Sequence, residues 1–306
     1  MSTSHEPTNI RIGIDLGGTK VEAVALDASG TILARERVPT PRDYGATVDA
    51  IVGLVRDVES KAGARGTVGV GIPGAVNPRT GLVKNANSTW LIGQPLRGDL
   101  EAELARPVRM ENDANCFALS EAVDGAGSGA SNVFGVILGT GVGGGIVIDG
   151  KVIEGVNLIA GEWGHNPLPW IRADEFPGPE CYCGKNGCIE TFLSGPGFES
   201  DYAATTGRRL AARAIVDAAT VGEPAARDAL ARYHDRLARA LSSVINLLDP
   251  DVIVLGGGMS NTPGLAAAVS ERLPLYVFSN SVETRVVGNK HGDSSGVRGA
   301  AWLWPL

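Results

Sequence analysis

Residues 10–26 read I-R-I-G-I-D-L-G-G-T-K-V-E-A-V-A-L, and this stretch sets the pattern of the fold. Two apolar runs, at 10–16 and 21–26, flank the turn-type sequence G-G-T-K. A third run follows at 31–38 after a serine and a glycine. Short apolar runs separated by glycine-containing turns are typical of β-hairpins, so we expect a hairpin and a third antiparallel strand.

The same plan returns in the second half of the chain. An apolar run at 133–138 is followed by Gly139, Thr140 and Gly141, and then by a further apolar run at 146–148. A strand, a glycine–threonine turn and a strand therefore occur twice, which indicates two related halves.

The remaining apolar patterns alternate between strand and helix. Val48, Ile51, Val55 and Val58 recur within 44–62 at spacings typical of an amphipathic helix. Such alternation indicates an α/β protein. We predict further strands at 67–72, 108–111 and 252–255 and further helices at 113–124, 226–248, 263–273 and 295–303.

Length and composition limit the class of protein. A chain of 306 residues, 43% of them hydrophobic, can form two modest domains with packed cores. The net charge of −7 and the lack of a long basic block argue against nucleic acid and anionic membranes as partners. Residues 1–9 lack the apolar region of a secretory signal, and no apolar run is long enough to span a bilayer. We therefore expect a cytoplasmic protein.

Three glycine-rich segments follow apolar runs, as in proteins that bind phosphate groups. Glycine lets backbone N–H groups approach an anion, and in the first segment Thr19 adds a hydroxyl and Lys20 a positive charge. Asp15 would repel phosphate, so its natural role is to hold Mg²⁺. A tight hairpin with an aspartate in its turn is the alternative. Glycine-rich segments recur after apolar runs at 139–145 and 256–258, and this repetition favours a nucleotide-binding cleft. The signatures of a P-loop and of a dinucleotide-binding fold are absent.

The densest group of potential metal ligands comprises His165, Cys181, Cys183 and Cys188. One imidazole and three thiolates complete a tetrahedral zinc site. In a reducing cytoplasm, clustered cysteines favour a metal over a disulfide. Glu162 and Glu190 flank the group, whereas Cys116 stands apart and is expected to be a small buried residue.

The sequence E-N-D-A-N at 111–115 lies where a predicted strand leads into a predicted helix. Asp113 can serve there as a helix N-cap. An ordinary aspartate has a pKa near ~3.9, so it is also ionised at neutral pH and can accept a proton from an alcohol. The residues alone leave both roles open.

Together these motifs resemble the ROK family of sugar kinases, within the actin/hexokinase-like superfamily. The similarity runs from about Arg11 to the C-terminus and includes C-x-C-G-x-x-G-C-x-E, an element specific to the family. The stretches K-N-A-N-S-T-W at 84–90 and H-G-D-S-S-G at 291–296 resemble bacterial fructokinases of the manno(fructo)kinase type. The other motifs that carry the resemblance lie at 15–20, 111–115, 138–145, 161–165 and 252–260.

The resemblance implies an actin/hexokinase-like (ribonuclease H-like) fold with two α/β domains and a cleft between them. The expected division is a disordered tail at 1–9, an N-terminal domain at 10–118 plus 295–306, and a C-terminal domain at 119–294 with a zinc-binding segment at 165–188. The expected cofactors are ATP, Mg²⁺ and a structural Zn²⁺. The positions expected to bind ATP are Gly13, Asp15, Gly17, Gly18, Thr19, Lys20, Gly139, Thr140, Gly141, Gly143, Gly257 and Gly258.

The resemblance also implies roles in the reaction. Asp113 matches the general base of the family, which would take the proton of the sugar hydroxyl as it attacks the γ-phosphate. His165 would bind zinc with Cys181, Cys183 and Cys188, and offer its other ring nitrogen to the sugar. The positions expected to bind the sugar are Gly74, Asn112, Asp113, Glu162, His165 and Glu190.

We therefore expect a homodimeric ATP-dependent hexose kinase with D-fructose as the favoured substrate. Mannokinase, glucokinase and N-acetylglucosamine kinase are the alternatives within the family. A ROK repressor would need a helix-turn-helix domain before the first strand, and residues 1–9 are too few for one. A zinc hydrolase needs an open metal position, which four protein ligands do not leave. A non-catalytic sugar sensor is the last alternative, and Asp113 argues against it.

Overall fold

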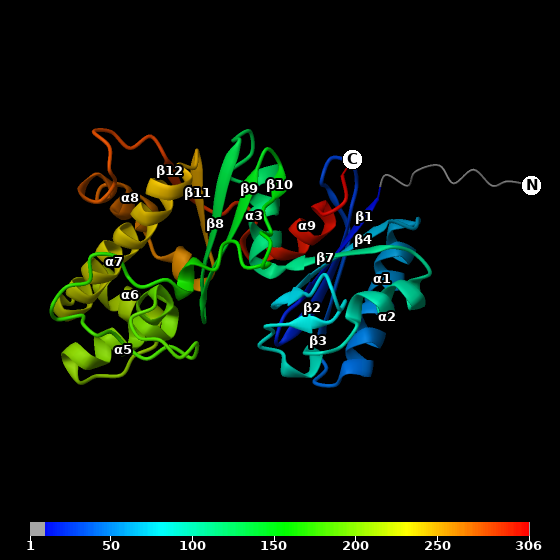
Figure 1. The fold of residues 1–306 in the computed structure, drawn as a ribbon, viewed down its shortest axis with the longest axis horizontal. Helices are drawn as coiled ribbons and strands as arrows, with labels where there is room; N and C mark the ends of the chain where they lie inside the picture. The colour runs from blue at the N-terminus through cyan, green and yellow to red at the C-terminus, as the bar shows by residue number, and fades with distance from the viewer. Residues whose placement is uncertain (1–9, 306) are drawn as a thin grey trace, which may run out of the picture. The chain divides into compact units, whose positions relative to one another are not determined.

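The computed structural model describes residues 10–305, which form two compact units, each with its own five-stranded sheet (Figure 1). The first unit runs to Gly125 and also includes Glu154–Leu158 and the segment from Asp293 onward. The second unit comprises Ala126–Ile153 and Ile159–Gly292. The tail expected at 1–9 lies outside the described residues.

The first sheet consists of β1 (Arg11–Leu16), β2 (Lys20–Leu26), β3 (Ile32–Pro39), β4 (Thr67–Ile72) and β7 (Val108–Asn112). β1 and β2 form the predicted hairpin, with Asp15 opposite Glu22, and β3 adds the third antiparallel strand. β4 and β7 lie parallel to β1 on its other side, so the strand order is β3-β2-β1-β4-β7. The predicted hairpin and third strand are therefore confirmed.

The helices of the first unit are α1 (Tyr44–Ala62), α2 (Leu96–Leu104), α3 (Asp113–Val123) and α9 (Ser295–Trp302). α1 begins after its cap Asp43, whose side chain accepts the N–H of Ala46, and ends at Gly63, which has a φ of 75°. α1 and α2 pack their apolar side chains on one face of the sheet, and α3 and α9 cover the other face (Figure 1).

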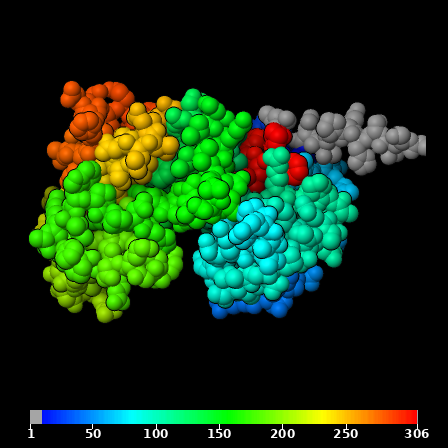
Figure 2. Space-filling model, viewed as in Figure 1, coloured from blue at the N-terminus to red at the C-terminus, as the bar shows by residue number. Residues whose placement is uncertain are grey.

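The C-terminal helix α9 packs closely against β1 and β4 of the N-terminal sheet. A Cβ on Gly13 would collide with the carbonyl oxygen of Val297, and one on Gly69 would collide with that of Ala300. Figure 2 shows the last residues of the chain, in red, among those of the first unit. Gly13 thus packs under α9 and lies outside the hairpin turn, and its expected role in ATP binding stays a prediction.

The second sheet consists of β8 (Asn132–Leu138), β9 (Val142–Ile148), β10 (Lys151–Val152), β11 (Val252–Gly256) and β12 (Arg285–Gly288). β8, β9 and β10 are antiparallel neighbours, whereas β11 and β12 run parallel to β8. The order β10-β9-β8-β11-β12 repeats that of the first sheet strand for strand. The two related halves predicted from the sequence are therefore confirmed.

The helices of the second unit are α4 (Ile189–Leu193), α5 (Gly195–Thr206), α6 (Ala212–Thr220), α7 (Pro224–Leu248) and α8 (Leu265–Ser270). α7 buries Tyr233, Leu237 and Leu241 in the core, as predicted. The prediction of a helix at 263–273 is wrong in length, because α8 starts only after Gly264, which has a φ of 74°. The short elements are β5 (Ala75–Val76), β6 (Val83–Lys84) and 3₁₀ turns at Thr89–Leu91, Trp163–His165, Gly258–Asn261, Leu273–Leu275 and Gly292–Ser294.

The boundaries of the units differ from the expected domains. A division after residue 118 would cut α3, which continues to Val123. Glu154–Leu158 belongs to the first unit, where Lys84 Nζ donates to the carbonyl of Asn157 at 3.0 Å. Over residues 10–305, no helix combines the length and apolar character needed to cross a membrane.

A buried cluster of ion pairs ties the loop before the cysteine segment to α7. The carboxylate of Glu175, 5% exposed, lies 2.7 Å from Arg239 and 2.8 Å from Arg236. Arg239 also donates to the carbonyls of Pro169 and Trp170. Burial alone would raise the pKa of Glu175, but the hydrogen bonds from Arg239 and Arg236 lower it to about 2.

We expect Glu175→Gln to lower the free energy of unfolding at neutral pH by about 3 kcal/mol, because two buried arginines lose a countercharge. A carboxylate with a lowered pKa stabilises the fold above its unfolded pKa of about 4.3, and this stability is lost as the pH falls toward about 2. Urea unfolding at a series of pH values should therefore show that the free energies of unfolding of the wild type and of Glu175→Gln differ at neutral pH. This difference should shrink below about pH 4. Glu180→Gln, at an exposed position nearby, is the control. A difference that does not change with pH would contradict this account.

Candidate functional site

The turn between β1 and β2 is held from two sides. The N–H of Gly17 donates to the carbonyl of Lys20 at 3.0 Å and closes the turn. Thr40 donates its hydroxyl to the carbonyl of Gly17 at 2.7 Å and its N–H to that of Thr19 at 3.1 Å. Gly18 and Thr19 are exposed at the tip. The predicted glycine segment is therefore a braced turn whose tip can meet a ligand.

A buried carboxylate, Glu22, holds Lys20 beside this turn. Its fully buried side chain lies 3.2 Å from Lys20 Nζ. Arg35 and Arg37 of β3 pair with the same carboxylate at 2.5 and 2.8 Å. Because three cations share one negative charge, the cluster keeps a net positive charge next to the turn, which suits a phosphate group. The sequence analysis did not identify Glu22 or the two arginines.

Asp15 lies at the end of β1 among other carboxylates. Burial raises the pKa of Asp15 to about 7, and the negative charges of Asp113 and Glu22 add to this effect, whereas Lys20 opposes it. A bound cation would favour the ionised form of such a carboxylate. Mg²⁺ prefers oxygen ligands, so this half-buried carboxylate fits the predicted magnesium position.

Asp113 is the first residue of α3, and its neighbour Asn112 is the cap. Asn112 Oδ1 accepts the N–H of Ala114 at 2.9 Å and that of Asn115 at 3.4 Å. Asp113 is exposed, and its Oδ1 also accepts the N–H of Ala114, at 2.8 Å. The cap role considered for Asp113 thus belongs to Asn112, which strengthens the case for a chemical role of Asp113.

Further contacts fix the junction between β7 and α3. Glu111 Oε1 accepts the N–H of Asn112 at 2.7 Å and the side-chain amide of Asn115 at 3.0 Å. Asn112 Nδ2 donates to the carbonyl of Gly74 at 3.1 Å. Gly74 has a φ of 78°, and a Cβ there would collide with the carbonyl of Lys84. Asn112 and Gly74, both expected at the sugar, therefore lie in contact, and Glu111 braces the same junction through contacts that the sequence analysis did not predict.

The turn between β8 and β9 is held by Glu190. The N–H of Gly139 donates to the carbonyl of Gly141 at 2.9 Å, and Glu190 Oε2 accepts the N–H of Val142 at 2.8 Å. A Cβ on Gly141 would lie 2.5 Å from this carboxylate oxygen, so glycine makes room for it. Thr140 is exposed at the tip. One oxygen of Glu190, a residue expected to bind the sugar, thus braces a glycine turn.

A cavity of about 580 Å³ opens beside this turn in the second unit. Gly139, Thr140 and Gly258, all expected to bind ATP, line it, whereas Gly257 packs against the backbone of Leu138. A cavity with an apolar wall and a few polar groups suits a nucleobase. The apolar wall comprises Pro196, Val216 and Met259, and the polar groups include Asn261 and Thr262.

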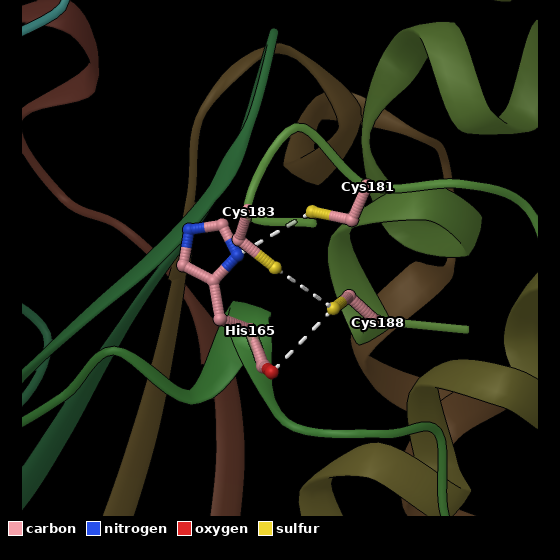
Figure 3. A group of neighbouring side chains, drawn as sticks. All are labelled: His165, Cys181, Cys183 and Cys188. Carbon is pink, nitrogen blue, oxygen red and sulfur yellow. Dashed lines mark hydrogen bonds between the residues drawn. The ribbon is translucent and has the colours of Figure 1, made fainter. Parts of the chain in front are cut away.

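The predicted metal ligands His165, Cys181, Cys183 and Cys188 come together, with their ligand atoms within 4.8 Å of one another (Figure 3). Cys183 Sγ lies 3.6 Å from Cys188 Sγ, and Cys181 Sγ lies 3.6 Å from His165 Nδ1. Tetrahedral zinc, with bonds of about 2.3 Å to sulfur and 2.0 Å to nitrogen, separates its ligands by about 3.5–3.8 Å. The cysteines are free thiols, so the donor set fits a zinc ion.

The second ring nitrogen of His165 has a protein partner. Nε2 lies 2.9 Å from the hydroxyl of Tyr182. Desolvation of this hydroxyl and the negative charges of Glu190 and Glu162 raise the pKa of Tyr182 to about 12. Tyr182 therefore occupies the ring nitrogen that was expected to face the sugar, and a sugar that binds there would have to displace this hydroxyl.

The turn Trp163–His165 joins the predicted zinc-binding segment, residues 165–188, to the second sheet. Trp163 Nε1 donates to the carbonyl of Gly143 at 2.9 Å, and its ring meets Phe134 edge to face at 5.7 Å. Glu162 is exposed directly before this turn. Gly143, expected to bind ATP, therefore accepts a hydrogen bond through its carbonyl from the turn that leads into the zinc-binding segment.

These parts suit phosphoryl transfer, which needs phosphate positioning, charge neutralisation and a base for the attacking hydroxyl. The first unit supplies a braced glycine turn, a cationic cluster and the carboxylates Asp15 and Asp113. The second unit supplies another glycine turn, the cavity suited to a nucleobase, and Glu190 beside the cluster of metal ligands.

Several known sugar kinases share the sequence pattern and fold of this chain. The ROK family matches residues 11–306. N-acetyl-D-glucosamine kinases from Shigella boydii and Escherichia coli are 43% identical over 296 residues, covering 95% of this chain and 98% of theirs. The ROK hexokinase from Thermus thermophilus has a TM-score of 0.85 and 32% identity, covering 96% of this chain and 97% of that one. A ROK family glucokinase from Streptomyces griseus, solved with glucose and AMPPNP, has a TM-score of 0.78 and 30% identity, covering 96% and 98%.

These neighbours confirm the α/β, actin/hexokinase-like fold. They do not support the fructokinase type expected from residues 84–90 and 291–296, because the curated relatives described above are N-acetylglucosamine kinases. The match covers both units and all the motifs of the candidate site. The chain therefore belongs to the ROK family of sugar kinases.

Proposed function

We propose that this sugar kinase is an N-acetyl-D-glucosamine kinase, which transfers the γ-phosphoryl group of ATP to the 6-hydroxyl of the sugar. The observation that carries the choice of sugar is the 43% identity with relatives of that name. The kinase chemistry has separate support in the braced turns, the carboxylates and the cavity. D-Fructose, which residues 84–90 and 291–296 favour, is the second candidate.

Asp113 acts as the general base in this proposal. Its carboxylate accepts the proton of the sugar hydroxyl while the hydroxyl oxygen attacks the γ-phosphorus. The electron pair of the broken P–O bond passes to the leaving ADP. Asn112 caps α3 and Glu111 binds Asn112, so these residues keep Asp113 at the start of the helix.

The phosphates of ATP bind at the glycine turns, and Lys20 supplies positive charge to them. Glu22 holds Lys20 in place through the ion pair at 3.2 Å. Mg²⁺, held by Asp15, would neutralise charge on the phosphates when bound. The adenine occupies the cavity of the second unit, against Val216 and Met259.

The metal cluster binds one structural zinc ion in this proposal. Four protein ligands leave no open position for water, so a zinc hydrolase is not favoured. The cluster supports the turn that follows Glu162 and the start of α4, which carries Glu190. The residues proposed to bind the sugar are Gly74, Asn112, Asp113, Glu162, His165 and Glu190. The homodimer and the cytoplasmic location stay predictions.

The test is ATP turnover with N-acetylglucosamine, glucose, mannose and fructose in parallel. We expect ADP release with kcat/KM at least about tenfold higher for N-acetylglucosamine than for fructose. NMR should identify the product as the 6-phosphate. Asp113→Asn, prepared in the same way, controls for contaminating kinases.

Three other outcomes would change the proposal. A higher kcat/KM for fructose would reverse the choice of sugar. If none of the four sugars is phosphorylated, the proposed kinase activity is refuted. Sugar binding without turnover would favour the non-catalytic sensor.

A further inference from the structure

Tyr182 is an exposed aromatic residue that contacts His165 through both its ring and its hydroxyl. It stands between Cys181 and Cys183, and it is 84% exposed. Its hydroxyl lies 2.9 Å from His165 Nε2, and the two rings meet edge to face, with centroids 5.1 Å apart. Ordering an exposed side chain costs rotamer entropy, so contact of both ring and hydroxyl with one neighbour points to a role at that neighbour.

The two ring nitrogens of His165 face different partners. Nδ1 lies 3.6 Å from Cys181 Sγ and belongs to the cluster of metal ligands (Figure 3). A ring nitrogen that binds zinc carries no proton, so the proton of the neutral imidazole lies on Nε2. The Nε2–H group therefore donates to the hydroxyl oxygen of Tyr182, which accepts through a lone pair.

A hydrogen-bond acceptor at the second nitrogen usually orients a metal-binding histidine and raises its basicity. Carboxylates, backbone carbonyls and water commonly take this role. Within residues 10–305, the partner that the structure places at His165 Nε2 is Tyr182. The oxygen of a phenol has lone pairs that can accept this hydrogen bond, as the oxygen of a carbonyl or of water does.

We propose that Tyr182 is a positioning residue for the zinc ligand His165: its hydroxyl accepts the Nε2 proton and holds Nδ1 toward the three sulfur atoms. The proposal rests on the proposed zinc binding and not on the identity of the sugar. Zinc affinity should therefore depend on a residue that is not itself a ligand.

Zinc affinity tests this directly, by competition with a chelator of known affinity. Tyr182→Phe keeps the ring and removes only the acceptor oxygen. Tyr276→Phe is the matched control, because it removes a hydroxyl of the same unit whose partner is Asp235 and not a metal ligand. We expect the zinc Kd of Tyr182→Phe to rise about tenfold or more, and that of Tyr276→Phe to equal the wild-type value.

Cobalt in place of zinc supplies a second readout, because the absorption bands of Co²⁺ report the geometry of its ligands. We expect these bands to shift in Tyr182→Phe and to stay unchanged in Tyr276→Phe. A zinc Kd for Tyr182→Phe within about twofold of the wild type would overturn the proposal, as would identical cobalt spectra. A wild-type protein that binds no zinc would overturn the metal assignment and this proposal together, whereas absence of sugar turnover would refute only the kinase.

Discussion

Asp113→Asn is expected to lower kcat by about 10²–10⁴-fold, because an amide cannot accept the proton of the attacking hydroxyl. Asparagine has nearly the shape of aspartate, and α3 keeps its cap at Asn112, so the fold should be retained. The dissociation constant of the sugar should therefore change little. A loss confined to kcat is the sign of a group that acts in the transition state.

Steady-state turnover gives kcat for this variant, and isothermal titration gives the sugar affinity. Asp43→Asn is the matched control, because it makes the same change at the exposed cap of α1, where asparagine serves equally well. Its kcat should equal the wild-type value. If Asp113→Asn also turns over at nearly the wild-type rate, Asp113 has only a structural role at the start of α3.

Cys183→Ser should release zinc and destabilise the second unit. A hydroxyl is a poor substitute for a zinc-binding thiolate. Zinc binding and folding are coupled, and binding in small zinc domains is worth about 10–16 kcal/mol, so we expect the melting temperature to fall by about 10 °C or more. Cys183 is only half-buried, so the exchange of sulfur for oxygen by itself costs little packing.

Elemental analysis and thermal unfolding measure the two effects of Cys183→Ser together. The control is Cys116→Ser, which alters a buried thiol of α3 in the first unit. That variant should lose some stability, because it buries a hydroxyl, but it should keep one zinc ion per chain. Stoichiometric zinc in Cys183→Ser would show that Cys183 is not a ligand.

The fold could be predicted wherever local signals agree with tertiary packing. Both ends of α1 agree with the prediction, because its apolar spacing lies between a capping aspartate, Asp43, and Gly63. α5 was missed because it opens with a glycine, Pro196 and another glycine, and it buries few apolar side chains. β12 is only four residues long, and one of its side chains is buried, so its position depends on pairing with β11.

The candidate site could be predicted where its residues are close in the sequence. The metal ligands were found from their spacing, and Asp113 from its place between a strand and a helix. The hydrogen bond between Glu190 and Val142 spans 48 positions and requires the packing of α4 beside β9. Likewise, the cluster around Glu22 depends on the register of β2 with β3, which brings Arg37 directly opposite. The sequence could not identify the partner of each His165 nitrogen, because this depends on the orientation of the ring.

The packing of α9 on β1 and β4 has a consequence for biosynthesis. The ribosome completes the second unit before it makes Ser295–Trp302, although the strands that this helix covers are among the first to be made. Until then, Val24 and Leu26 of β2 lack their apolar partners Val297 and Ala301. Domains generally fold as units during synthesis, so the second unit can mature while this face of the first unit is still open.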